Sequence, residues 1–234
     1  MGQYLSPVLW LLLAISASMI ALGNEDPFAR DLLCGFGVCP TSGHASAWNK
    51  LAYDTGVGVF LSLVFYWLLV RVPEMQKRKR LKKSLTTQYR MFKQDCLATM
   101  VGVTVGAFKM ETVHQLMGQN EFRAFFNAQA TQDQNRWDAF QNKIQPHNVS
   151  DLMIAMEVFR DEIGYVLNNV DIESDEAFDF FQRLLGAIHS VGRSTVDLDD
   201  GDRLSGFLWQ MFSGWDPVKG YRDHDIVARM IEQI

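Results

Sequence analysis

Residues 56–72 form a long apolar run, G-V-G-V-F-L-S-L-V-F-Y-W-L-L-V-R-V, with no charge before Arg71. A helix of nearly 20 predominantly apolar residues is long enough to cross the hydrocarbon core of a bilayer. The sequence K-R-K-R-L-K-K follows at residues 77–83, which we call the basic collar. We therefore predict a membrane-spanning helix at residues 56–72, with the basic collar beside it.

A second apolar run covers residues 4–22 and has no charged side chain before Glu25. Two interpretations compete for residues 1–23: a retained transmembrane helix, with Tyr4 and Trp10 near the interface, or a secretory signal peptide cleaved near Ala21 and Gly23. A signal peptide normally carries a basic amino-terminal region and a shorter apolar core. Both features are missing, which favours the retained helix.

The basic collar predicts the orientation of the protein, because Lys and Arg accumulate on the cytoplasmic side of a span. Both ends of a two-pass protein then lie in the cytoplasm, with residues 24–55 as an extracytoplasmic loop. We therefore predict that the protein is located in a bacterial inner membrane. Cys34 and Cys39 lie in that loop, where an oxidising compartment favours a disulfide between them.

Residues 73–109 are predicted to form a basic juxtamembrane region and the first cytoplasmic helix. Pro73 predicts an end or a bend where the helix leaves the bilayer. Further along, the uncharged stretch 96–108 holds Gly102 and Gly106 in a G-x-x-x-G pattern. That pattern lets two helices approach closely, and it makes the two glycines a candidate helix-packing site. Burial in a core is the favoured explanation for this stretch, and the alternatives are a re-entrant segment or an oligomer contact.

Residues 110–234 show helical periodicity throughout, and we identified no convincing strand and no internal repeat. The clearest stripe alternates steps of three and four residues: Val149, Leu152, Met156, Phe159, Ile163, Val166 and Val170. Such a stripe indicates a helix in a bundle or a coiled-coil seam, and only three heptads are present, which favours the bundle. The predicted fold class is all-α: two transmembrane helices followed by an acidic cytoplasmic helical bundle.

Charge is distributed very unevenly along the chain, whose net charge is −5. Residues 71–109 carry ten cations and two acidic residues, whereas residues 110–234 carry ten cations and 21 acidic residues. An acidic domain argues against nucleic acid as a partner, because phosphate contacts need a basic surface. The basic collar instead predicts contact with lipid headgroups, through Lys77, Arg78, Lys79, Arg80, Lys82 and Lys83.

No catalytic, cofactor-binding or metal-binding motif was found, so an enzyme is unsupported by the sequence and no site residue of those kinds is predicted. An aromatic series near the carboxyl end offers another kind of candidate. Core packing explains it, and the alternative is a partner surface formed by Trp209, Trp215 and Tyr221, since Trp and Tyr suit interfaces.

These features predict a membrane-anchored helical module that binds a protein or a small molecule in the cytoplasm, as a sensor or scaffold. The alternative is an oligomeric membrane effector or pore gated by its cytoplasmic domain. Small residues in the two apolar runs, Ser16, Ser18, Gly56 and Gly58, would permit close helix packing in that case. A membrane-bound enzyme with an unrecognised site is the third hypothesis. The expected partners are the lipid bilayer and either a protein partner or further copies of the chain.

Overall fold

A computed structural model describes residues 2–23, 45–193 and 200–234 of the protein. The described residues are mostly helical, which confirms the all-helical character of the predicted fold. Cys34 and Cys39 lie outside them, so the predicted disulfide stays a prediction. The chain divides into two compact units, Met1–Lys77 and Arg78–Ile234, and each is described by itself.

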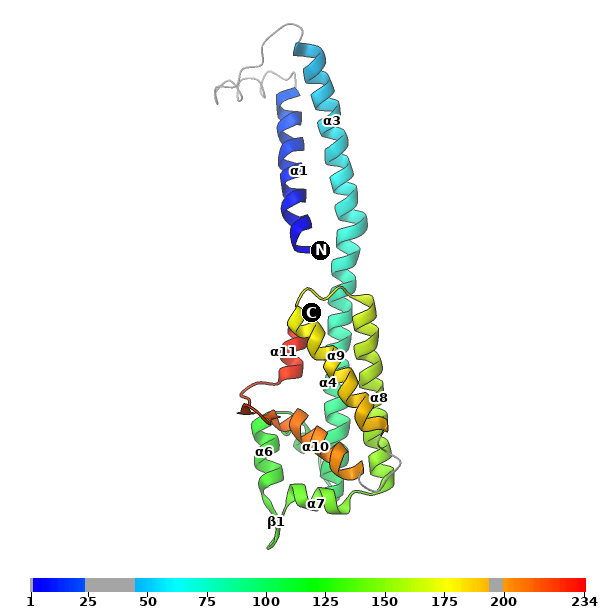
Figure 1. Ribbon diagram of the computed structural model, residues 1–234, viewed down its shortest axis with the longest axis vertical. Helices are drawn as coiled ribbons and strands as arrows, with labels where there is room; N and C mark the ends of the chain where they lie inside the picture. Colours follow the sequence, from blue (N-terminus) through cyan, green and yellow to red (C-terminus); the bar gives the residue numbers. More distant parts are fainter. Residues whose placement is uncertain (1, 24–44, 194–199) are drawn as a thin grey trace. The chain divides into compact units, whose positions relative to one another are not determined.

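The first unit contains helix α1 (Gly2–Gly23), helix α3 (Ala45–Tyr66) and a π-helical turn, η1 (Trp67–Arg71), which leads into α4 (Val72–Val105). α1 and α3 pack side by side (Figure 1). They approach each other closely at Gly56, where an added Cβ would lie 3.0 Å from Met19 Cβ and 3.1 Å from the Ser16 carbonyl oxygen. Ser16 and Gly56 are buried here, whereas Gly58 meets open space.

One helix in the described residues is long and apolar enough to cross a membrane, the continuous stretch Lys50–Val105. Within the described residues, α1 (Gly2–Gly23) is identified only as a shorter apolar helix, Pro7–Ile20. The prediction of two transmembrane helices is therefore not confirmed. Helix α3 also begins at Ala45, well before residue 56, because Lys50 and Asp54 lower the hydropathy without breaking the helix.

Of the two outcomes predicted for Pro73, an end or a bend of the helix, the structure contradicts the end, because Pro73 is the second residue of α4. A proline inside a helix removes one backbone donor and crowds the carbonyl four residues earlier. The π-helical turn η1 lies immediately before it, and the Val72 amide donates to the Trp67 carbonyl. A single π turn of this kind absorbs a local change in the hydrogen-bond ladder without interrupting the helix.

The second unit is a helical bundle built around the part of α4 from Arg78 onward. Its further elements are α5 (Met110–Gln115), α6 (Gln119–Asn127), β1 (Gln129–Thr131), β2 (Gln134–Asn135), α7 (Arg136–Lys143), α8 (Pro146–Asn169), α9 (Asp175–Arg193), α10 (Asp200–Ser213), β3 (Trp215–Asp216), β4 (Gly220–Tyr221) and α11 (Ile226–Glu232). The two antiparallel hairpins, β1–β2 and β3–β4, were missed from the sequence. Strands of two or three residues are too short to show alternation.

The core of the bundle joins α4, α8 and α10 through aromatic side chains. Phe92 on α4 stacks on Phe159 of α8, with ring centroids 4.9 Å apart, and its centroid lies 5.7 Å from that of Phe212 on α10. The central residues of the predicted α8 stripe are buried, namely Leu152, Met156, Phe159, Ile163 and Val166. This burial confirms the bundle interpretation of that periodicity.

Candidate partner-binding site

The C-terminal hairpin, residues 215–221 (W-D-P-V-K-G-Y), is shaped by hydrogen bonds to Asp216. One carboxylate oxygen of Asp216 accepts from the backbone amides of Val218 and Lys219, at 2.8 and 2.9 Å, and the other pairs with Arg222. An aspartate that accepts from the amides two and three residues later stabilises a tight turn. The amides of Lys219 and Val218, followed by Arg222, hold the pKa of Asp216 below its usual value.

Helix α6 supports the base of this hairpin through Arg123. The guanidinium carbon of Arg123 lies 4.7 Å from the ring centroid of Tyr221, within the range of a cation–π contact. Its Nη1 also donates to the Ser213 carbonyl at 2.9 Å. Gly214, which follows Ser213 and precedes the hairpin, has a φ of 69°, a conformation that residues with a side chain disfavour. The hairpin is therefore fixed at its base and not only by its own ladder.

Apolar side chains are nevertheless presented to solvent on this hairpin. Val218 at the tip is 89% exposed, and the cross-strand partners Trp215 and Tyr221 are 37% and 51% exposed. Two of the three residues predicted as a partner surface thus lie opposite each other on one hairpin. We call Arg123, Trp215, Val218 and Tyr221 the hairpin surface. Val218 was not singled out in the sequence. Arg123 was not predicted because only the fold brings α6 to the hairpin.

Trp209, the third predicted residue, is partly buried and belongs to an aromatic cluster that packs against the core of the bundle. Its ring centroid lies 4.7 Å from that of Trp137 and 5.6 Å from that of Phe122. The aromatic series near the carboxyl end therefore has two roles, as its two interpretations suggested. Trp209 and Phe212 pack inward, whereas Trp215 and Tyr221 face solvent.

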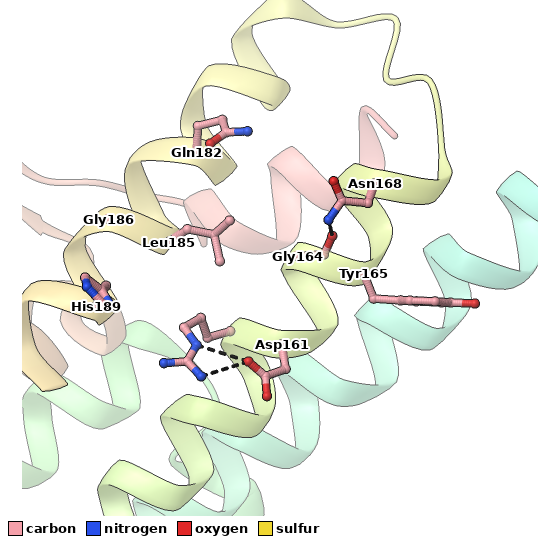
Figure 2. Close-up of a pocket in the computed structure, with 9 residues that line it drawn as sticks. Asp161, Gly164, Tyr165, Asn168, Gln182, Leu185, Gly186 and His189 are labelled. Atoms are coloured by element: carbon pink, nitrogen blue, oxygen red, sulfur yellow. Dashed lines mark hydrogen bonds and ion pairs between the residues drawn. The ribbon is translucent and has the colours of Figure 1, made fainter.

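A groove of about 650 Å³ lies between α8 and α9 (Figure 2). Asp161 and Asn168 line it from α8, and Gln182, Leu185 and His189 line it from α9. Two glycines, Gly164 and Gly186, leave open space where side chains would stand. The groove is open to solvent, and the Asp161 carboxylate is already paired with Arg160 at 2.9 Å. No cluster of three metal-binding side chains occurs here or elsewhere in the described residues.

The six cations of the basic collar have different surroundings. Arg78 Nη1 lies 2.8 Å from a carboxylate oxygen of Glu173, and Arg78 Nε donates to the Ile234 carbonyl. Lys82 donates to the Glu232 carbonyl. Lys77, Lys79, Arg80 and Lys83 are exposed. Two of the predicted lipid contacts are thus directed toward the bundle, which the sequence did not indicate.

Gly102 and Gly106 do not share a helix face in the structure. Helix α4 ends at Val105, and Gly106 follows it with a φ of 81°, its amide donating to the Gly102 carbonyl at 2.9 Å. A glycine in this conformation is a common way to end a helix. Gly106 therefore caps α4, and the predicted helix-packing role of the two glycines stays a prediction. The uncharged stretch around them is partly core, because Cys96, Leu97, Met100 and Val101 are buried.

Two further titratable groups lie in or beside the core. Cys96 is a free, buried thiol whose pKa is raised well above its usual value by burial and by the charge of Asp95, which makes it a poor nucleophile. The carboxylate of Asp225 accepts from the Tyr89 hydroxyl at 2.7 Å and from Lys93 Nζ at 2.9 Å. It also caps α11. This cluster joins α4 to α11 and has a structural role.

No protein-family model, no curated protein and no solved structure matches this chain.

Proposed function

We propose that this protein is a membrane-anchored helical module that binds a protein partner in the cytoplasm through the hairpin surface. The observation that carries the proposal is a hairpin fixed by Asp216 and Arg123 that keeps Trp215, Val218 and Tyr221 exposed. Trp, Tyr and Arg are the residues most enriched among those that dominate binding energy at protein interfaces. A rigid surface also loses little conformational entropy on binding.

The proposed membrane anchor is the apolar helix that contains residues 56–72. Its large side chains Phe60, Leu61, Phe65, Trp67 and Leu68 are exposed on the single chain, which is favourable in lipid and unfavourable in water. The hydroxyls of Ser16, Ser18 and Ser62 donate to carbonyls of their own helices, so they need no water in a bilayer. We propose a two-pass anchor in a bacterial inner membrane, with both ends in the cytoplasm.

The hairpin surface favours a protein partner over a small molecule. Sites for small molecules commonly enclose 70% or more of the ligand surface, and the groove between α8 and α9 is open. The alternative of an oligomeric effector relied partly on small residues in the apolar helices. Gly56 and Ser16 are already used in contact between α1 and α3 of one chain.

Site-specific photocrosslinking in cells tests the proposal. A photoreactive amino acid at Val218 of the full chain is expected to form an adduct with a single partner protein. The matched control is the same amino acid at Gln132, an exposed residue in the turn of the β1–β2 hairpin. The substitutions Trp215→Ala and Tyr221→Ala should each weaken binding roughly 30-fold, as expected for a dominant interface residue. Equal crosslinking from both positions, or adducts unaffected by these substitutions, would refute the proposal.

A further inference from the structure

The basic collar lies on one helix, α4, but its cations point from two different sides of it. Arg78 and Lys82 are separated by four residues, and continuing by three and four residues leads to Leu85 and Tyr89, both buried. At about 100° per residue these four positions share one face. Lys79, Arg80 and Lys83 lie on the other side by the same geometry, and all three are exposed.

The first side is occupied by contacts within the bundle. Lys82 donates to the carbonyl of Glu232, the last residue of α11, and Arg78 donates to the carbonyl of Ile234, two residues beyond that helix. The last carbonyls of a helix lack partners within the helix and carry partial negative charge, so cations are favourable there. Arg78 adds an ion pair with Glu173. These two side chains are therefore occupied by contacts within the bundle.

The second side is a separate basic surface. None of the ion pairs found among the described residues involves Lys79, Arg80 or Lys83. Along α4 they lie seven to eleven residues beyond Val72, which at 1.5 Å per residue is about 10–16 Å of helix. Long basic side chains extend toward the polar layer of a bilayer while their stems lie against less polar surface. Anionic headgroups beside the proposed span are thus within reach of these cations.

We propose that Lys79, Arg80 and Lys83 bind anionic phospholipid headgroups, whereas Arg78 and Lys82 hold α11 on the bundle. The inference rests on the proposed membrane anchor and deepens it by dividing the basic collar between two partners. Each cation near an anionic surface strengthens association about fivefold, so three give roughly a hundredfold preference for anionic over zwitterionic lipid.

The test uses the full chain in vesicles of phosphatidylcholine with or without phosphatidylglycerol. After mild extraction, native mass spectrometry counts the lipids of each kind that remain bound. The triple variant Lys79→Gln, Arg80→Gln and Lys83→Gln should lose the preference for phosphatidylglycerol by roughly a hundredfold, with an unchanged unfolding temperature. The matched variant Arg78→Gln and Lys82→Gln should keep most of the preference and unfold at a lower temperature. Inorganic phosphate at millimolar concentration should not displace the lipid.

The outcomes separate the two proposals. Wild-type protein that is stripped from vesicles by alkaline carbonate has no anchor, which refutes the anchoring proposal and this inference with it. Protein that stays in the membrane, but whose triple variant retains wild-type lipid preference, refutes this inference alone. Equal loss of preference in the two variants would show that the collar is not divided. Displacement by inorganic phosphate would identify a site for free anions instead of lipid.

Discussion

Replacing Asp225 with alanine is expected to destabilise the bundle by about 4–6 kcal/mol. The Asp225 carboxylate accepts hydrogen bonds from Lys93 Nζ and from the Tyr89 hydroxyl. It also caps α11 by accepting from the backbone amides of Val227 and Ala228. Typical stabilities of 5–15 kcal/mol make this a large fraction of the total.

The magnitude follows from the surroundings of each group. The Lys93 side chain is 4% exposed and that of Asp225 is 21% exposed, so the substitution leaves a buried cation without its partner. Breaking a buried pair costs about 3–5 kcal/mol, and we take the lower end because water reaches Asp225. Losing the helix cap adds about 1 kcal/mol. An unpaired Tyr89 hydroxyl adds about 1 kcal/mol or more.

Two matched substitutions separate these contributions. Asp225→Asn keeps an oxygen that can cap α11 but removes the charge, and it should cost about 2–3 kcal/mol. Lys93→Met removes the buried cation together with the need to pair it. Asp225 keeps its hydrogen bonds and some contact with water, so this substitution should cost only about 1–2 kcal/mol.

Urea unfolding of the full chain in detergent micelles measures these differences through the fluorescence of Trp137 and Trp209, which lie in the aromatic cluster. The reasoning requires the order Asp225→Ala, then Asp225→Asn, then Lys93→Met, from most to least destabilising. It fails if Asp225→Ala lies within 1 kcal/mol of the wild type, or if Lys93→Met is the most damaging of the three.

Two further predictions concern alkaline pH and the helix pair of the first unit. Burial raises the pKa of Tyr89 and of Cys96 well above their usual values, so the unfolded chain loses these protons first. Stability should therefore fall as pH rises above about 9 for Cys96 and above about 10 for Tyr89, by about 1.4 kcal/mol per pH unit for each group. Cys96→Ala should remove its share of that slope in unfolding titrations, and an unchanged slope would contradict this. Separately, Gly56→Val should separate α1 from α3, because its side chain would collide with Met19, whereas Gly58→Val should be tolerated. Disulfide crosslinking between cysteines introduced in α1 and α3 reports the difference, and equal crosslinking in both variants would show that Gly56 is not a close contact.

Local sequence patterns were sufficient to predict the helices but insufficient to predict the sites. The stripe on α8 predicted its buried face because a helix that packs on one side must repeat apolar residues every three to four positions. The hairpin surface was only half predicted, since Trp215 and Tyr221 are conspicuous in the sequence while Arg123 is 90 or more residues away. Lys93 and Asp225 are 132 residues apart, and no local pattern connects residues that far apart.

The basic collar shows most clearly which properties the sequence determined and which the tertiary structure decided. The sequence by itself determined that the chain is helical, that an apolar helix carries a dense group of cations beyond it, and that an acidic bundle follows. These properties depend on composition and on periodicity within one element. Only the tertiary structure decided which cations serve the bundle, because that depends on where the end of α11 meets α4. Neighbouring cations in the sequence point about 100° apart on a helix, so Arg78 and Lys79 have different partners although they are adjacent residues.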